Sequence, residues 1–255
     1  MSEAQTASGI ILRAEAVGKD FGKFTALKNV SAEFPRGAIT AIIGPNGAGK
    51  STFFNLLCGA LRPSRGRILF EGRDTAGLPQ HRFAHLGISK SFQITSVFPL
   101  LTTHENVRIA LQAMASRFDI WRPRTRLAGL ADRADSILAT LGIADRRERL
   151  AGTLAHGEQR ALEVGMALAS DPLVLLLDEP TAGMSPEETR AMMDLIVRLG
   201  SERTVILIEH KMKLVMGICD RLLVLHHGEM LAEGTPDEIR RNDTVKRVYL
   251  GQRKH

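Results

Sequence analysis

The chain has 255 residues, of which 44% are apolar, and carries a formal net charge of +6. This length and apolar content suffice for one large buried core or for two lobes. No stretch approaches the ~18 uncharged apolar residues of a membrane-spanning helix, and residues 1–9 lack the features of a signal peptide. Cys58 and Cys219 show no metal-ligand spacing and are expected in the core. The positive charge favours an anionic partner, either nucleic acid or lipid headgroups.

The chain begins with a β-type pattern. Residues 10–35 alternate as antiparallel strands do, with apolar runs at Ile10–Leu12 and Val30–Phe34. Phe21 lies in a turn between these runs. Its ring could either cover the core or stack on a nucleotide base, and stacking needs no hydrogen-bond readout. Because a nucleotide-type glycine loop follows about two dozen residues later, we favour contact of the Phe21 ring with adenine.

A glycine-rich loop follows the apolar run Ile39–Ile43 and opens onto a helical segment. Strand, glycine loop, Lys-Ser/Thr and helix in this order make a P-loop. Its glycines let backbone N–H groups turn toward a phosphate, and the helix N-terminus adds its positive dipole end. Lys50 is predicted to reach the β- and γ-phosphates, and the Ser51 hydroxyl to bind Mg²⁺. A chance match is expected in about one per cent of chains this long, so we predict nucleotide binding. The loop comprises Gly44, Pro45, Asn46, Gly47, Ala48, Gly49, Lys50, Ser51 and Thr52.

A helical insert follows. One more strand is predicted at Arg67–Glu71, and the β-type pattern ends near Gln93. Thr102–Glu105 reads as a capping box before a helix to about Ala115, and a second helix is predicted over about 126–141. The connection between them is basic, and a solvated loop is favoured over a binding patch there. Its arginines are Arg117, Arg122, Arg124 and Arg126.

Two later segments add candidate site residues. Gly157 leads into an apolar-periodic helix, which is either a second phosphate site or only a loop. Asp178 and Glu179 end an apolar strand that is typical of a central parallel sheet, and ligands bind at the carboxyl ends of such strands. Asp178 suits a Mg²⁺ shell and Glu179 can polarise a water molecule for attack on the γ-phosphate. The alternative is that both acids are merely solvated.

The last third continues the α/β pattern. A capping box at Ser185–Glu188 opens a helix to about Leu199, and Thr204–Ile208 reads as a buried strand. His210 follows it and could donate to a γ-phosphate oxygen, although alone it would be taken for a surface histidine. A hairpin is predicted over 222–233, and a helical tail over about 235–251.

Together these motifs resemble the ATP-binding subunit of ABC transporters over essentially the whole chain. Gly44–Ser51 matches the Walker A loop and Leu173–Asp178 the Walker B strand. The resemblance implies ATP and Mg²⁺ as cofactors. It implies Lys50, Glu179 and His210 as catalytic residues and Phe21 as the adenine contact. Mg²⁺ would be held by Ser51, Gln93 of the Q-loop and Asp178. The ABC signature, which contacts ATP, corresponds to Leu154, Ala155, His156, Gly157 and Glu158.

The resemblance also implies an architecture and partners. The expected fold is α/β, a RecA-like P-loop NTPase core with a mostly parallel sheet, an antiparallel β-subdomain and a helical subdomain. Residues 1–92 and 171–255 would form the core and residues 93–170 the helical subdomain. Two such subunits would sandwich two ATP molecules. The expected partners are a second ATP-binding subunit, two membrane permeases and a periplasmic or extracellular substrate-binding protein, with no nucleic acid. The protein would be peripheral, on the cytoplasmic face of the inner (plasma) membrane.

Several stretches resemble the branch that serves importers of branched-chain and other hydrophobic amino acids. They are Ser91–Gln93, Ile208–Met216, Gly234–Ile239 and Val248–Gly251. Two residues depart from the general pattern: Ala155 replaces a signature serine, and Ser185 replaces the aspartate of the D-loop. The ATPase of lipopolysaccharide export is the alternative within the family. A soluble ABC-type ATPase acting on nucleic acid or ribosomes is the alternative from another class.

A permease is expected to dock near residues 93–103. The segment Ile94–Leu101 is apolar and loop-like, which suits a surface that receives a partner's helix. The alternative is that Val97, Phe98 and Leu101 pack internally.

Overall fold

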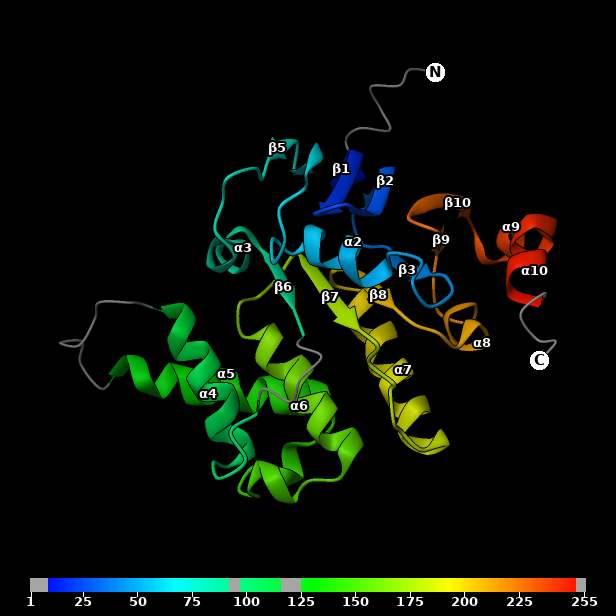
Figure 1. The fold of residues 1–255 in the computed structure, drawn as a ribbon. Helices are drawn as coiled ribbons and strands as arrows, with labels where there is room; N and C mark the ends of the chain where they lie inside the picture. The colour runs from blue at the N-terminus through cyan, green and yellow to red at the C-terminus, as the bar shows by residue number, and fades with distance from the viewer. Residues whose placement is uncertain (1–8, 92–96, 116–124, 251–255) are drawn as a thin grey trace.

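The computed structural model describes residues 9–91, 97–115 and 125–250 of the chain. Two sheets and a group of helices make up the molecule (Figure 1). The predicted α/β fold, with a mostly parallel sheet beside an antiparallel one, is confirmed. Within the described residues, no helix combines the length and the apolar character needed to cross a membrane. Gln93, and the arginines at 117, 122 and 124, lie outside the described residues.

The larger sheet carries the strands that lead to the site. Its order is β10-β9-β3-β8-β7-β6, and all neighbours run parallel except the β9–β10 hairpin. Strands β3, β7 and β8 are buried along their whole length, which matches their apolar sequences. The strands are β3 (Ile39–Ile43), β6 (Ile88–Lys90), β7 (Val174–Asp178), β8 (Thr204–Ile208), β9 (Arg221–His226) and β10 (Glu229–Gly234).

The smaller sheet is antiparallel, in the order β2-β1-β4-β5. Strands β1 (Ile10–Phe21) and β2 (Phe24–Pro35) are longer than the two short apolar runs that the sequence indicated. They continue to a tight turn at Gly22, whose φ of +59° is a left-handed conformation that glycine adopts readily. The sheet is completed by β4 (Arg65–Phe70) and β5 (Arg73–Asp74).

Helix α2 (Lys50–Leu57) packs between the two sheets. Phe53, Phe54 and Leu57 are fully buried in a core formed with both sheets. Alternate residues of β3, β7 and β8 point into this core and into a second core on the other face of the large sheet, which α7 (Pro186–Gly200) covers. This packing on both sheets holds the helix that follows the P-loop in place.

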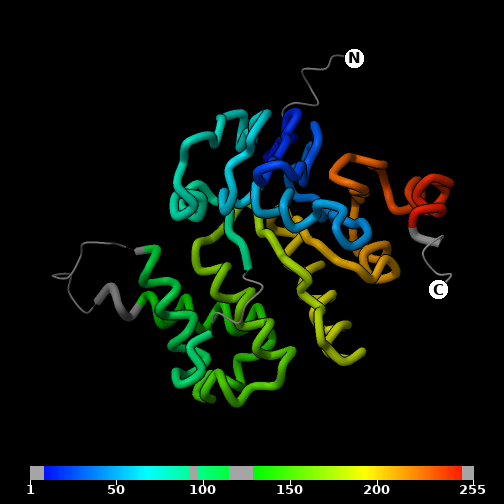
Figure 2. The backbone as a smooth tube through the Cα atoms, in the orientation of Figure 1, coloured from blue at the N-terminus to red at the C-terminus, as the bar shows by residue number. Residues whose placement is uncertain are grey.

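A helical group is inserted between β6 and β7 (Figure 2). It comprises α4 (Thr103–Ala115), α5 (Thr125–Leu141) and α6 (His156–Leu168), which pack on one another through Leu111, Leu138 and Leu162. The predicted capping box of α4 is present, because Thr102 and Glu105 exchange hydrogen bonds between their side chains and backbones. Short 3-10 turns at Ala144–Arg146 and Ala151–Thr153 connect α5 to α6.

The chain ends in short helices beside the β9–β10 hairpin. The predicted tail is two helices, α9 (Pro236–Arg241) and α10 (Asp243–Leu250), because Asn242 between them is extended. Thr235 and Glu238 form the capping box that the sequence indicated. Two further helices were not anticipated: α3 (Gln80–Leu86), which precedes β6, and α8 (Met212–Val215), which follows β8.

Candidate nucleotide-binding site

Three neighbouring parallel strands end at one edge of the large sheet. Ile42 of β3 and Asp178 of β7 both pair with Ile208 of β8, so their carboxyl ends are level. The chain leaves β3 into the P-loop, β7 into Glu179 and β8 toward His210. Residues that are more than a hundred positions apart therefore meet at this edge, as expected for a ligand site of an α/β sheet.

The P-loop has the backbone conformation that its glycines permit. Gly47 and Gly49 have φ of +76° and +97°, and Gly49 directly precedes the first residue of α2. A Cβ on Gly49 would lie 2.8 Å from Leu27 Cδ2 and 2.9 Å from the carbonyl oxygen of Ala26. Glycine is therefore required there both by conformation and by close packing. The loop is further held by Gly228, whose N–H donates to the carbonyl of Ala48.

Lys50 is held by the loop that it belongs to. Its ammonium donates to the carbonyl oxygens of Gly44 at 2.8 Å and Pro45 at 3.0 Å. Burial lowers the pKa of Lys50, while the carboxylates of Glu179 and Asp178 act in the opposite direction. A phosphate at the loop would offer this cation a charged acceptor in place of two carbonyls.

Asp178 offers an oxygen to a metal ion. Its Oδ2 lies 3.3 Å from the ammonium of Lys90, which also donates to Asn55. The other oxygen, Oδ1, is buried and has no hydrogen-bond partner in the described part of the chain. A buried unpartnered carboxylate oxygen is costly unless a ligand or water satisfies it. Together with the exposed Ser51 on the loop, this oxygen fits the oxygen ligands that Mg²⁺ prefers.

Glu179 and His210 meet across the strand ends. The Nε2 atom of His210 lies 2.5 Å from Oε1 of Glu179. Glu179 has a φ of +50°, which is uncommon for a residue with a side chain. Its N–H donates to the carbonyl of Ile208 at 3.0 Å, so the unusual conformation is fixed by β8. The structure therefore brings together the two side chains that were predicted to act on the γ-phosphate and the attacking water.

A hollow of about 400 Å³, within the size range of ligand pockets, joins the P-loop to Glu179 and His210, whereas Asp178 is not among its lining residues. The predicted contact Phe21 is not among its lining residues, whereas Phe24 is. Phe21 pairs with Phe24 across the β1–β2 turn, and the Lys19 ammonium lies 5.1 Å from the Phe21 ring centroid. Pattern reading missed Phe24 because the residue stands on the far side of the turn. Contact between Phe21 and adenine stays a prediction. The hollow is lined by Phe24, Ala26, Asn46, Gly47, Ala48, Gly49, Lys50, Ser51, Thr52, Glu179 and His210.

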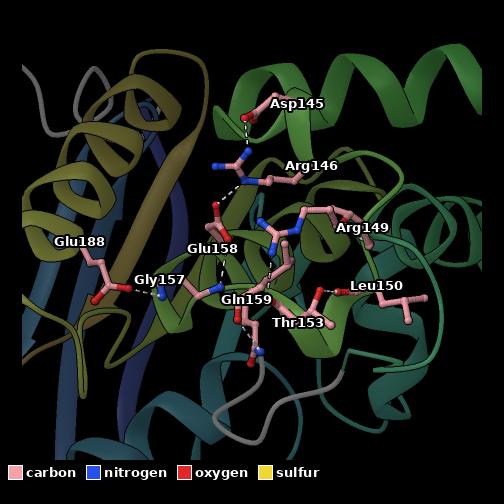
Figure 3. Close-up of polar contacts among 12 residues, drawn as sticks. Asp145, Arg146, Arg149, Leu150, Thr153, Gly157, Glu158, Gln159 and Glu188 are labelled. Atoms are coloured by element: carbon pink, nitrogen blue, oxygen red, sulfur yellow. Dashed lines mark hydrogen bonds and ion pairs between the residues drawn. The ribbon is translucent and has the colours of Figure 1, made fainter.

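The predicted signature lies apart from this hollow, at the N-terminus of α6. The N–H of Gly157 donates to Oε1 of Glu188 on α7 at 2.8 Å (Figure 3). A Cβ on Gly157 would meet the same side chain at 2.8 Å. The N–H that was predicted to bind a phosphate thus already donates to a carboxylate. None of the residues Leu154–Glu158 lines the hollow described above.

Glu158 anchors the same helix end on its other side. It accepts the N–H of Ala155 at 3.0 Å and the Nε–H of Arg146 at 2.8 Å, and Arg146 also pairs with Asp145 (Figure 3). Burial alone would raise the pKa of Glu158, but Arg146 and the Ala155 N–H outweigh it and keep the pKa below its ordinary value. Ala155 has no hydroxyl, so only the glutamate half of a capping box is present.

A parallel sheet, a P-loop and acids at the neighbouring strand ends define a P-loop nucleotide-binding protein. Residues 27–182 match the ABC transporter family, and residues 229–255 match the branched-chain amino acid ATP-binding cassette transporter family. The chain belongs to the ABC transporter family, of which it is an ATP-binding ATPase component.

Individual relatives cover nearly the whole chain. LivG of Salmonella typhimurium, a high-affinity branched-chain amino acid transport ATP-binding protein, is 42% identical over 91% of this chain and 94% of its own. BraF of Pseudomonas aeruginosa, described in the same words, is 38% identical over 95% and 98%. LptB of Acidithiobacillus ferridurans, a lipopolysaccharide export system ATP-binding protein, is 33% identical over 94% and 97%.

Solved structures agree with this assignment. An ATP-binding cassette of an ABC transporter in its ADP conformation has a TM-score of 0.85 and 31% identity, covering 95% of this chain and 99% of its own. A cassette solved as a dimer in a post-hydrolysis state, with ADP and phosphate bound, has a TM-score of 0.75 and 25% identity, covering 89% and 99%.

Proposed function

We propose that this chain is the ATP-hydrolysing subunit of an importer for branched-chain or related hydrophobic amino acids. The observation that carries the proposal is the identity of 38–42% to branched-chain amino acid transport proteins along nearly their full lengths. The C-terminal match to a branched-chain amino acid cassette family supports it independently. The export alternative is weaker, since the lipopolysaccharide relative is only 33% identical.

The roles of the site residues follow from their positions. Loop N–H groups and Lys50 hold the phosphates of ATP, while Glu179 acts as general base on the attacking water. His210 orients Glu179, whose Oε1 its Nε2 contacts at 2.5 Å. It donates to the γ-phosphate once ATP is bound, and an N–H of Nε2 given to the phosphate must first leave Glu179. Ser51 and Asp178, with Gln93 from outside the described residues, hold Mg²⁺. When bound, this ion neutralises charge on the phosphates.

The signature acts on the ATP of a second subunit. Leu154–Glu158 do not line this chain's own hollow, and the dimeric cassette among the structural neighbours supports a two-subunit arrangement. In that arrangement Gly157 would meet the partner's γ-phosphate. Glu188 must then release the Gly157 N–H, because one N–H cannot serve two anions in the same position. Residues 1–92 and 171–255 form the core of this unit, and residues 93–170 the part that presents the signature.

The membrane partners dock on the helical group. Phe98 and Leu100 are 47% and 83% exposed, whereas Val97 is buried, so only part of the predicted apolar segment packs internally. The buried side chain of Asn106 accepts the N–H of Phe98 and donates to carbonyls of residues 98 and 102, which fixes the loop. With the exposed Leu150 on the adjoining segment, this presents an apolar surface to a permease helix. We place the protein on the cytoplasmic face of the membrane, with two permeases and a substrate-binding protein and no nucleic acid.

The Glu179→Gln variant tests the chemical assignment. The amide cannot take a proton from water, while the P-loop stays intact, so turnover should fall at least ~100-fold with ATP affinity preserved. ATP hydrolysis and binding of a fluorescent ATP analogue measure the two quantities. The variant should accumulate as an ATP-bound dimer in size-exclusion chromatography. Turnover near that of the wild type would remove Glu179 as the base.

A further inference from the structure

Glu209 is a buried carboxylate to which the roles above assign nothing. It is 3% exposed and follows β8 directly. In the part of the chain that the structure describes, no lysine, arginine or histidine side chain lies within ion-pair distance of it. An isolated buried carboxylate costs several kcal/mol unless hydrogen bonds satisfy it. Its position is therefore maintained by its neutral donors.

Those donors come from both strand ends of the site. Oε1 of Glu209 accepts the backbone N–H of Thr181 at 3.1 Å and the Thr181 hydroxyl at 2.5 Å. Oε2 accepts the N–H of His210 at 3.2 Å. Thr181 is fully buried, so its hydroxyl has no access to water. One carboxylate thus links the segment after β7 to His210, whose imidazole contacts Glu179.

The segment that is held in this way includes Glu179. Residue 179 is in the left-handed conformation, its carbonyl accepts the N–H of Ala182 at 3.1 Å, and Thr181 lies two residues beyond it. The Glu179 N–H is fixed on β8 at one side, and Glu209 fixes Thr181 at the other.

We propose that Glu209 is a positioning residue for ATP hydrolysis. Through Thr181 it fixes the turn that orients the Glu179 carboxylate. Through the His210 N–H it fixes the position of that turn relative to the imidazole. It does not line the hollow that would hold the nucleotide. The inference rests on the proposed roles of Glu179 and His210.

Four variants separate positioning from general stability. Glu209→Gln keeps the shape of the side chain but replaces one carboxylate oxygen with an NH₂ group. That group is a donor, and it faces either the donors of Thr181 or the N–H of His210. Thr181→Val removes only the hydroxyl, and Thr181→Ser restores it. Thr204→Val is the matched control, because Thr204 is a buried threonine at the opposite end of β8 whose hydroxyl is likewise hydrogen-bonded, although as an acceptor, from the N–H of Gly37 at 2.9 Å.

ATP turnover, ATP affinity and thermal unfolding are measured for each variant. We expect Glu209→Gln and Thr181→Val to lower kcat by about tenfold or more, which corresponds to about one buried hydrogen bond. The Kd for ATP should stay within about twofold, since the P-loop is not involved. Thr181→Ser and Thr204→Val should turn over as the wild type does. If Glu209→Gln does not fold, the Thr181 pair decides.

Two results would overturn the proposal. One is unchanged kcat in Glu209→Gln or, where that variant does not fold, in Thr181→Val. The other is a loss of turnover in Thr204→Val as large as in Thr181→Val, which would indicate a purely structural role. The Glu179→Gln variant is run in parallel. If it loses turnover while Glu209→Gln keeps it, only the positioning role fails; if it keeps turnover, the proposed chemistry fails as well.

Discussion

At the residue scale, Gly157 shows how much depends on one missing side chain. Its local pattern, a glycine before a helix, is weak evidence by itself, and it was the resemblance to the ABC signature that made the residue a predicted ATP contact. In the structure its N–H faces the Glu188 carboxylate, and a Cβ would lie 2.8 Å from that side chain. Its neighbour Ala155 cannot cap the helix with a hydroxyl. Under the proposed function, backbone N–H groups and the helix dipole therefore have to carry phosphate recognition at this end of α6.

Substitutions at these two residues should differ sharply in effect. Ala155→Ser adds about one hydrogen bond, on the order of 1 kcal/mol, so steady-state ATP turnover should stay within roughly tenfold of the wild type. Gly157→Asp places a carboxylate against Glu188 and against the expected phosphate, so turnover should be abolished. Single-site ATP affinity, measured on the monomer, should hold in both. An increase of several orders of magnitude in Ala155→Ser would identify a weakened cassette instead.

At the element scale, glutamates in the first turns of α4, α7 and α9 cap these helices. Glu105, Glu188 and Glu238 each accept a backbone N–H of a capping residue. These hydrogen bonds lower the pKa of each carboxyl below its ordinary value of 4.5. Such caps are readable from sequence because both partners lie within four residues.

The sign of their pH dependence follows. A lowered folded-state pKa contributes stability above the unfolded value of 4.5, and this contribution is lost as the pH falls through the folded value. We expect Glu105→Gln to be less stable than the wild type at pH 7 and to approach it well below pH 4.5. Urea unfolding at both pH values measures this. Glu148→Gln, at an exposed glutamate outside any cap, is the control, and an equal difference at both pH values in Glu105→Gln contradicts the account.

The loop before α4 makes a second element-scale prediction. Phe98→Glu and Leu100→Glu place charges on the exposed apolar surface without disturbing the hydrogen bonds of Asn106. Transport should fall severalfold, while basal ATPase activity and thermal stability hold, because in the proposed assembly the surface contacts only the permease. Val197→Glu, at an exposed apolar residue of α7, should leave transport unchanged. Collapse of stability in the Phe98 variant would make that residue part of the core.

The strands and helices were largely predictable from the sequence, but the order of the strands in the sheet and the contacts between distant residues were not. The buried strands β3, β7 and β8 follow from continuous apolar runs, and the P-loop from its local spacing. The sequence placed His210 beside two phosphate-site strands but could not order them; the structure puts β8 between β3 and β7. The contacts of Glu209 with Thr181, and of Glu188 with Gly157, join residues 28 and 31 positions apart. Such pairs depend on tertiary packing and leave no local pattern.

At the scale of the whole molecule, the proposed two-subunit arrangement gives one chain two halves of different ATP sites. The P-loop hollow gathers Lys50, Glu179 and His210, while Gly157 stands elsewhere on α6, closed by Glu188. Neither half is complete alone, so the chain by itself should hydrolyse ATP slowly. In the proposal, two copies, or this chain with a related one, complete both sites, and permeases couple them to transport.

Uptake of radiolabelled leucine by cells lacking this chain tests the central claim most directly. The account predicts that leucine uptake falls in the deletion strain, is restored by the wild-type chain and is not restored by Glu179→Gln at equal expression. Unchanged leucine, isoleucine and valine uptake in the deletion strain would contradict amino acid import, and an accompanying failure of the outer envelope would support the export alternative. Full restoration by Glu179→Gln would contradict the assignment of the hydrolytic base.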